Sequence, residues 1–386
     1  MSGPLQGLRI IDLSHVLNGP FGTVLLAHMG AEVLKIEWGQ GDRFRHAWMP
    51  LDASHDGYEF LAVNTNKKGI TLNLKHARGK EIFLELVKRS DAVVENFSIG
   101  VMERLGLDYS RLREVNPRII YASSKGYGED GPKAHMRANA ATIMAATGWT
   151  NVAWEFSGRR GTVPQGIGDE AAGVSMALGV LAALYAREQS GHGQKIEVSM
   201  QEALLGFMVS NFHTLFESRP VGALPKQCAD GYVAFHLPDM PDGLWESFAT
   251  AMGHPEAIHE PRFATAVSRR EHYTEWDQLV ASWVKSATRE ELAQVFGTTG
   301  ISAAPIVTLA EVLEDEHLRH RQAFVDVEDP RAGTVKMLRP WIRFSETPAE
   351  ITTSAPLVGQ HNDEVYHGLL GFDDDELANL KAEGVI

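Results

Sequence analysis

The chain has 386 residues, of which 44% are hydrophobic and 22% are charged, and its formal net charge is −14 at pH 7. This length allows two or three domains, and the composition is that of a folded globular protein rather than a disordered one. The acidic charge argues against nucleic acid as a partner, so an anionic ligand would need a local cluster of lysine and arginine. Cys228 is the only cysteine, which leaves no disulfide within the chain and no thiolate zinc site.

The N-terminal residues lack the apolar segment of a signal peptide. The longest uncharged apolar run, residues 171–186, is short for a membrane span. We therefore expect a cytoplasmic protein with no membrane partner.

The first two hundred residues alternate between strand-like and helix-like patterns. Residues 8–13 are typical of a buried strand, Pro20 suits the first position of a helix that runs to Met29, and residues 31–37 are typical of a second strand. Strand, helix, strand is the unit of a parallel sheet. Further strands are expected at 91–96, 118–124 and 195–198. Further helices are expected at 79–88, 138–147 and 200–217, and a short helix that ends at Arg104 is expected after the strand 91–96.

These patterns predict the α/β class, with a mainly parallel sheet. In such sheets ligands bind at the loops that follow the carboxyl ends of the strands. We expect those loops at residues 14–20, 38–45, 95–98, 124–131 and 165–169.

The pattern changes near residue 220. Residues 228–235 are typical of a single strand, and helices rich in Trp, Glu and Arg follow it up to about Ala293. We expect a smaller α+β domain here. The predicted division is 1–200 for the first part of the large domain, 201–224 for a linker, 225–325 for the small domain, and 326–386 for a second linker and the return to the large domain.

The stretch from Gln165 to Arg187 is the most distinctive segment of the chain. Its uncharged part, residues 171–186, is apolar on every side, which predicts a helix in the middle of the protein. Asp169 precedes this run in the glycine turn that starts at Gly166, where a carboxylate can cap the helix and is favoured by the helix dipole. We therefore expect Asp169 to be a rigidly held N-cap that is ionised at neutral pH.

Two roles are open for Asp169 at this point. It could be a helix cap and nothing more. It could also be a nucleophile, because an ionised carboxylate needs no general base to attack an activated acyl carbon, and nearby glycine N–H groups could stabilise the oxyanion. The glycines at 166, 168 and 173 fit neither a dinucleotide fingerprint nor a P-loop.

Basic residues lie in or near several of the predicted strand-end loops. Each one alone is typical of a solvated surface charge, but together they could form the local patch that phosphate groups require. They are Arg43, Lys75, Arg104, Lys125 and Arg137. No set of His, Cys, Asp and Glu with metal-ligand spacing is completed, so no metal is expected.

Several segments, in order along nearly the whole chain, resemble the class III (family III) CoA-transferases. They are D-L-S-H-V-L-N-G-P-F-G (12–22), A-E-V-L-K-I-E (31–37), N-T-N-K-K-G-I-T-L-N-L-K (64–75), V-E-N-F (94–97), K-G-Y-G-E-D-G-P (125–132), G-D-E-A-A-G (168–173), G-H-G-Q-K-I-E-V-S-M (191–200) and P-L-V-G-Q-H-N-D-E-V (356–365). Formyl-CoA:oxalate CoA-transferases are the best-known members. Residues 15–23 look most similar to the acetyl-CoA:oxalate branch.

The resemblance implies an interlocked homodimer, in which a Rossmann-like large domain holds both termini and a smaller domain lies between two linkers. It places the family nucleophile at Asp169. It places the CoA-binding residues at Val16, Leu17, Asn18, Leu72, Lys75, Asn96, Phe97, Ser98, Arg104 and Arg137, with Lys125 in the loop near the reacting centre.

The implied reaction moves CoA from an acyl-CoA thioester to a small carboxylic acid, through acyl-aspartyl anhydride and aspartyl-CoA thioester intermediates on Asp169. Coenzyme A is a substrate in this reaction, and no metal or redox cofactor is needed.

The chain departs from the family pattern at several points. Asn139 and Ala140 stand where relatives commonly carry an aromatic residue and a carboxylate, and Trp38 stands where the formyl-CoA enzyme has Arg. The stretch from Leu215 to Cys228 is shorter than usual, with no glycine run after it. We expect Trp48, Met49 and Met144 to belong to the core or to line an apolar acyl pocket.

Two alternatives remain open from the sequence. An α-methylacyl-CoA racemase would need an acid–base pair, and racemases carry Gly-His-Asp at about the place where this chain has Ala138, Asn139 and Ala140. A catalytically silent acyl-CoA-binding protein would not need Asp169 in its glycine turn.

Overall fold

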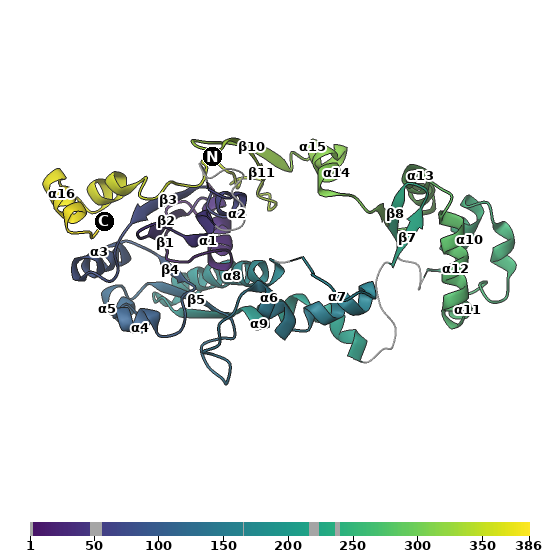
Figure 1. Cartoon of the computed structure of the whole chain (residues 1–386), viewed down its shortest axis with the longest axis horizontal. Coiled ribbons are helices and arrows are strands. Elements are labelled where there is room, and N and C mark those ends of the chain that lie inside the picture. Colours follow the sequence, from purple (N-terminus) through teal and green to yellow (C-terminus); the bar gives the residue numbers. More distant parts are fainter. Residues whose placement is uncertain (1–2, 47–55, 165, 216–223, 236–239) are drawn as a thin grey trace. The chain divides into compact units, whose positions relative to one another are not determined.

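A computed structural model of the chain describes residues 3–46, 56–164, 166–215, 224–235 and 240–386 (Figure 1). The chain divides into two compact units. The large unit comprises Met1–Phe212 and His320–Ile386, and the small unit comprises His213–Arg319. The small unit thus begins twelve residues and ends six residues earlier than the predicted 225–325.

The large unit is built on a six-stranded sheet in which every strand pairing is parallel. This confirms the predicted α/β class. The strand order β3-β2-β1-β4-β5-β6 reverses direction between β1 and β4, and ligands bind at such a reversal in doubly wound sheets. The strands are β1 (Arg9–Asp12), β2 (Glu32–Glu37), β3 (Lys67–Thr71), β4 (Ala92–Glu95), β5 (Ile120–Lys125) and β6 (Lys195–Ser199).

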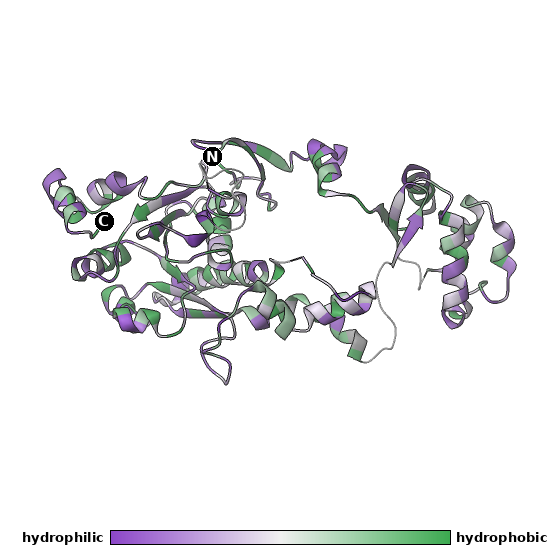
Figure 2. Ribbon diagram, in the orientation of Figure 1, coloured by the Kyte–Doolittle hydropathy of each residue, from purple (hydrophilic) through white to green (hydrophobic). Residues whose placement is uncertain are grey.

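Successive residues of the strands point to opposite faces of the sheet, so Ile10 and Ile11 enter different apolar cores. Hydrophobic residues concentrate on the sheet and on the helix beside it (Figure 2). One face is covered by α1 (Asn18–His28), α6 (Ala140–Ala146), α8 (Ile167–Ser190) and α9 (Met200–Phe207). The other is covered by α3 (Ala77–Lys88), α4 (Val101–Leu105), α5 (Tyr109–Val115) and α16 (Asp374–Ala382).

Shorter elements complete the large unit. They are η1 (Arg43–Arg45), α2 (Tyr58–Ala62), α7 (Trp149–Ser157), the antiparallel hairpin of β10 (Phe324–Asp329) and β11 (Gly333–Leu338), and η4 (Glu364–Leu369). The two points at which the chain passes between the units fall within η2 (Val209–Leu215) and α15 (Glu316–His320). The segment expected as one helix over 200–217 is instead α9 followed by the 3-10 helix η2. Gly206, Val209 and Asn211 have low helix propensity, which accounts for this break.

Two glycines allow α1 and α8 to cross at very short range. A Cβ added at Gly173 would lie 2.6 Å from the carbonyl oxygen of Asn18 and 3.0 Å from the backbone nitrogen of Gly22. A Cβ added at Gly22 would lie 2.7 Å from the carbonyl oxygen of Gly173. Any side chain at either position would therefore separate the two helices.

The sequence predicted that the apolar helix α8 would be buried on every side, but it is not. Its inner face packs against α1 and the sheet, but Leu178 is 66% exposed and Tyr185 is 72% exposed. By length and composition α8 could cross a membrane, yet 50% of its most apolar window is buried inside the unit. It is a core helix with an uncovered apolar face.

The small unit contains a three-stranded antiparallel sheet of β7 (Leu224–Cys228), β8 (Gly231–Phe235) and β9 (Ala303–Pro305). The prediction of a single strand over 228–235 was wrong. Ala229 and Asp230 make a tight turn between β7 and β8, and Gly231, which pairs with Cys228, begins β8. The helices are α10 (Asp242–Ala251), η3 (Pro255–His259), α11 (Ala266–Glu271), α12 (Tyr273–Val284), α13 (Arg289–Thr299) and α14 (Leu309–Glu314), and their core holds Trp245, Trp276 and Trp283.

The crossing of α1 and α8 makes a stability prediction. Gly173→Ala should lower the free energy of unfolding by about 1–3 kcal/mol, because the new methyl group meets backbone atoms that cannot rotate away. Gly297→Ala in α13 is the matched control, since a Cβ there meets nothing within 4 Å and the helix should be stabilised slightly. Urea denaturation of both variants measures the difference. Equal stability of the two variants would contradict the close crossing.

Candidate active site

The loops that follow β1 and β4 meet where the strand order reverses. The backbone N–H of His15 donates to Oδ1 of Asn96 at 2.9 Å, and Nδ2 of Asn96 donates to the carbonyl oxygen of His15 at 2.8 Å. The rings of His15 and Phe97 lie 5.5 Å apart, centroid to centroid. The structure thus brings together the segments 16–18 and 96–98, which the sequence assigned to CoA binding.

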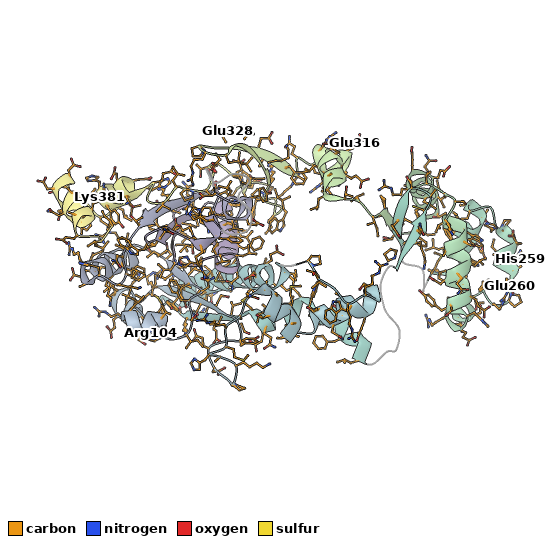
Figure 3. All side chains as sticks on the ribbon, viewed as in Figure 1. Arg104, His259, Glu260, Glu316, Glu328 and Lys381 are labelled. Carbon is orange, nitrogen blue, oxygen red and sulfur yellow. The ribbon has the colours of Figure 1, made fainter. Side chains whose placement is uncertain are left out.

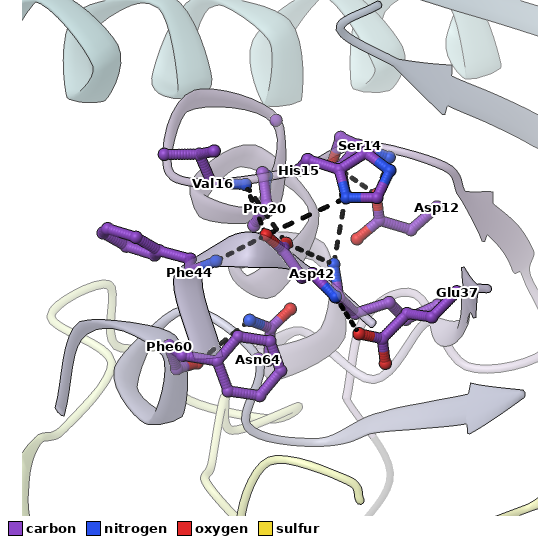
Figure 4. A network of polar contacts seen from close by, with 12 residues as sticks. Asp12, Ser14, His15, Val16, Pro20, Glu37, Asp42, Phe44, Phe60 and Asn64 are labelled. Carbon is purple, nitrogen blue, oxygen red and sulfur yellow. Dashed lines mark hydrogen bonds and ion pairs between the residues drawn. The ribbon is translucent and has the colours of Figure 1, made fainter. Parts of the chain in front are cut away.

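A group of buried charges lies beneath the loop that follows β1 (Figure 4). Nζ of Lys67 donates to Asp12 at 2.9 Å and Nζ of Lys35 donates to Asp42 at 3.1 Å, and all four side chains are fully buried. Asp12 also accepts hydrogen bonds from the hydroxyl groups of Ser14 and Thr23. These two buried ion pairs hold the backbone of the loop that follows β1 in place.

Sequence reasoning missed this buried network. The available signal was the presence of charged residues inside segments otherwise typical of buried strands, such as Lys35 within A-E-V-L-K-I-E. Buried lysines and carboxylates are rare unless they are paired, so Lys35 required a buried carboxylate partner.

Asp169 lies in the first turn of α8, on the side of the helix that meets α1. It precedes Gly173 by one turn, so both residues face the same direction, and Gly173 touches the first residue of α1, Asn18. One helical turn rises about 5.4 Å. The beginnings of α1 and α8 therefore lie close together, and they bring Asp169 near the loop 16–18.

The prediction that Asp169 caps α8 was wrong. The N-cap is Gly166, whose φ of 114° is readily adopted only by glycine, and Asp169 is the third residue inside the helix. The helix therefore begins at Ile167, two residues before Asp169, where the sequence analysis placed the cap. Among the described residues, which exclude Gln165, no side chain or backbone group is hydrogen-bonded to the Asp169 carboxylate.

The charge state of Asp169 also differs from the expectation. Burial, with the negative charge of Glu170 as a second cause, raises the pKa of Asp169 from 3.8 to about 7. The side chain is thus partly protonated at neutral pH rather than fully ionised. Reacting residues frequently have a strongly perturbed pKa and lie beside a ligand-binding loop.

The beginning of α6 lies against the same turn. A Cβ added at Gly168 would lie 3.5 Å from the Cα of Ala140, and Asn139 caps α6 with a hydrogen bond from the Thr142 N–H at 3.0 Å. Ala140, which stands where relatives commonly carry a carboxylate, therefore places a buried methyl group close to Asp169. The racemase alternative loses support here, because residues 138–140 offer neither acid nor base.

The predicted cationic residues fall into two groups. Lys75, Arg104 and Arg137 are exposed and have no carboxylate partner in the described part of the chain, and Arg104 stands on the surface of α4 (Figure 3). Arg43 is likewise exposed and without a carboxylate partner among the described residues. Lys125 instead donates to both oxygens of Glu95, at 2.7 and 2.8 Å, and to the Phe97 carbonyl oxygen at 2.7 Å. Lys75, Arg104 and Arg137 are available to an anionic ligand, whereas Lys125 holds the end of β5 against the loop that follows β4.

The remaining predicted residues are distributed as follows. Leu72 is 1% exposed, so only its backbone could meet a ligand. Ser98 is exposed and lines a cavity of about 140 Å³ together with Glu95 and Lys125. Met144 is buried in the core beside α8. Trp48 and Met49 lie outside the described residues, as does most of the short stretch 215–228.

Comparison with known proteins shows the family of the chain. The sequence profile of CoA-transferase family III matches residues 5–362. The chain is 35% identical to a formyl-CoA:oxalate CoA-transferase of Streptomyces coelicolor, with 99% of each chain covered. It is also 35% identical to a succinyl-CoA–D-citramalate CoA-transferase of Chloroflexus aurantiacus, with 99% of this chain and 98% of that chain covered.

A solved structure agrees with the fold. A CAIB/BAIF family protein of Brucella suis superposes with a TM-score of 0.84 at 26% identity, which covers 96% of this chain and 100% of that one. The parallel sheet, the loops at its reversal point and the full-length matches lead to one conclusion. The chain belongs to CoA-transferase family III and is an enzyme that transfers CoA to carboxylic acids.

Proposed function

We propose that Asp169 is the nucleophile of the transfer and carries the acyl group and then CoA in covalent linkage. The observation that supports this most strongly is the position of its carboxyl group, which lies in the first turn of α8, next to the segment 16–18 and without a hydrogen-bond partner among the described residues. A carboxyl group with only a structural role would be expected to have such a partner.

The proposed reaction begins when a carboxylate oxygen of Asp169 attacks the thioester carbon of the donor acyl-CoA. The C–S bond breaks, CoA leaves as a thiolate, and an acyl-aspartyl anhydride forms. The thiolate then attacks the Asp169 carbonyl carbon of the anhydride, which releases the donor acid as a carboxylate and leaves an aspartyl-CoA thioester.

The acceptor acid completes the cycle by the same two steps in reverse order. Its carboxylate attacks the aspartyl-CoA thioester, which gives a second anhydride and a CoA thiolate. The thiolate then attacks the acceptor carbonyl carbon, so that a new acyl-CoA leaves and the Asp169 carboxylate is restored. No proton is gained or lost over the cycle.

The backbone around Asp169 suits the charge that develops in these steps. The N–H groups of Leu17 and Asn18, at the start of α1, have no acceptor among the described residues. Free N–H groups at a helix N-terminus stabilise a developing oxyanion. We infer that these groups do so here.

The exposed cations indicate where the phosphates of CoA would bind. Lys75 follows β3, Arg104 lies on α4 after β4, and Arg137 precedes α6, so all three follow carboxyl ends of parallel strands. On a chain with a net charge of −14, unpaired cations in such loops provide the local positive potential that phosphates need. We assign them to CoA binding.

Two related enzymes act on formyl-CoA with oxalate and on succinyl-CoA with D-citramalate, which are small acids. We propose a small carboxylic acid as the acceptor. The methyl group of Ala140 near Asp169 removes a negative charge that relatives commonly carry there, so the acceptor site differs from that of the oxalate enzymes at this point.

We also propose that two chains form the interlocked homodimer implied by the family resemblance. Besides Leu178 and Tyr185 on the uncovered face of α8, the large unit exposes the apolar residues Phe207 of α9, which packs against α8, and Val209. A soluble protein seldom leaves so many neighbouring apolar side chains in water, and a second copy of the chain would cover them.

Removal of the proposed nucleophile tests the mechanism. Asp169→Asn and Asp169→Ala should fold normally but lose CoA transfer by roughly 10⁴-fold or more, because the bond-forming atom is gone. Glu170→Gln is the control, since it neutralises the adjacent carboxylate and leaves the nucleophile in place. Transfer of CoA between acids, followed by chromatography, measures the rates. Transfer by Asp169→Asn at a rate near that of Glu170→Gln would disprove the role of Asp169.

The pH dependence follows from the raised pKa of Asp169. Only the ionised form attacks, so kcat/KM should fall as the pH drops through about 7. Because the folded-state pKa of Asp169 exceeds the unfolded 3.8, the stability of the wild type relative to that of Asp169→Asn should fall as the pH rises from about 4 through 7.

Glu170→Gln provides a check on the cause of this shift. It removes a neighbouring negative charge, so the acid limb of the kcat/KM profile should move to lower pH. A wild-type limb below pH 5 would contradict the raised pKa of Asp169, and a limb that Glu170→Gln leaves unmoved would contradict the contribution of Glu170.

The interlocked dimer makes a kinetic prediction. Light scattering should give the mass of two chains. Tagged and untagged chains should form mixed dimers when they are co-expressed, but not when purified dimers are mixed under native conditions, because threaded chains cannot separate without unfolding. Leu178→Glu should prevent the formation of soluble dimer, whereas Val267→Glu in the small unit should not. Rapid exchange on mixing, or a monomeric wild type, would refute the proposal.

A further inference from the structure

The backbone of Val16 adopts an unusual conformation at the centre of the proposed CoA site. Its φ is +68°, in the left-handed region that β-branched residues strongly disfavour. The other non-glycine residues with positive φ in the described part of the chain are Asn66 and Gln322, which lack a branched Cβ. Such a conformation persists only where surrounding groups hold it, and it concentrates at functional sites.

Asp42 is the group that holds Val16. The Val16 N–H donates to both carboxylate oxygens of Asp42, each at 3.1 Å. Asp42 is itself fixed, because Oδ2 accepts from Nζ of Lys35 at 3.1 Å and Oδ1 accepts from the Phe44 N–H at 3.0 Å. Its own N–H donates to Oε1 of Glu37 at 2.7 Å. Figure 4 shows the carboxyl group of Asp42 directed at the Val16 nitrogen.

The residues on either side of Val16 are anchored by different partners. Ser14 is held by Asp12 and Lys35, and both backbone groups of His15 are held by Asn96. The Leu17 carbonyl oxygen accepts the Phe21 N–H at 2.7 Å. Asp42 is therefore the partner that acts on the Val16 peptide itself, immediately before the free N–H groups of Leu17 and Asn18.

The charge on Asp42 is secure in this position. Burial on its own raises the pKa of this carboxyl group, but the imidazole of His15, with Nδ1 3.8 Å from Oδ1, and the charge of Lys35 outweigh burial and hold the pKa well below its ordinary value. The side chain is completely buried, so it does not meet the substrate.

We propose that Asp42 is a positioning residue for CoA: it holds Val16 in the left-handed conformation and thereby aims the N–H groups of Leu17 and Asn18 at the ligand. This inference rests on the proposed function, because it takes the segment 16–18 as a CoA contact. Asp42 acts through Val16 and forms no bond to the substrate.

The test measures the affinity for coenzyme A itself by isothermal titration, which needs no knowledge of the donor or the acceptor. Asp42→Asn should weaken CoA binding by roughly tenfold, because the amide nitrogen that replaces Oδ2 cannot accept from the Val16 N–H or from Nζ of Lys35, and the left-handed Val16 loses support. In a Val16→Gly background the same substitution should weaken binding by no more than about threefold, since glycine adopts positive φ without strain.

Two further variants separate positioning from a general loss of stability. Asp329→Asn removes a buried carboxylate that likewise accepts two backbone N–H groups, from Arg331 at 2.9 Å and Ala332 at 2.8 Å, so it should lower stability without a change in CoA affinity. If Asp42→Asn leaves Lys35 unpaired and fails to fold, the double variant Asp42→Asn with Lys35→Met removes the buried pair together. It should show the same tenfold loss of affinity.

Each outcome bears on a different claim. Undiminished CoA binding by folded Asp42→Asn, or an equal loss in the Val16 and Val16→Gly backgrounds, overturns the positioning role and leaves the proposed function intact. Failure of the wild type to bind CoA overturns the proposed function and this inference with it. A tenfold loss that Val16→Gly suppresses supports the inference.

Discussion

The close crossing of α1 and α8 is the constraint on which the site depends. Gly22 and Gly173 let the two backbones touch, so the start of α1 comes within about one helical turn of Asp169. The loop that leads into α1 comes from β1, which lies next to the reversal of strand order. The proposed CoA-binding loop and the proposed nucleophile, far apart in the sequence, therefore share one small region of the large unit.

Burial acts on two aspartates of this region with opposite results. Asp42 is more deeply buried than Asp169, yet it keeps a low pKa because Lys35, His15 and backbone N–H groups compensate the lost hydration. Asp169 has no such compensation among the described residues and is raised to about 7. The difference matches the two proposed roles, a fixed charge that supports the backbone for Asp42 and a nucleophile with free lone pairs for Asp169.

Many of these features could be predicted from the sequence, and the predictions that failed did so for identifiable reasons. The parallel sheet follows from the alternation of strand and helix patterns, and the assignment of Asp169 and the residues 16–18 to the site follows from the family motifs. The cap role of Asp169 failed because glycine at 166 lets the helix start earlier than a polar cap would indicate. The uncovered face of α8 could not be foreseen, since an apolar pattern does not tell which neighbours a single chain supplies. The clamp on Val16 depends on a φ angle and on a carboxylate far along the chain, which no local pattern reveals.

The central claim is that Asp169 becomes covalently acylated, and mass spectrometry tests it most directly. The protein would be incubated with formyl-, acetyl-, succinyl- and a branched acyl-CoA, trapped with hydroxylamine or borohydride, and digested. The account predicts a modified peptide that contains residue 169 with at least one donor, and no modification in Asp169→Asn. An unmodified protein that turns over its donor, or that exchanges α-protons of the acyl group with deuterated solvent, would contradict it.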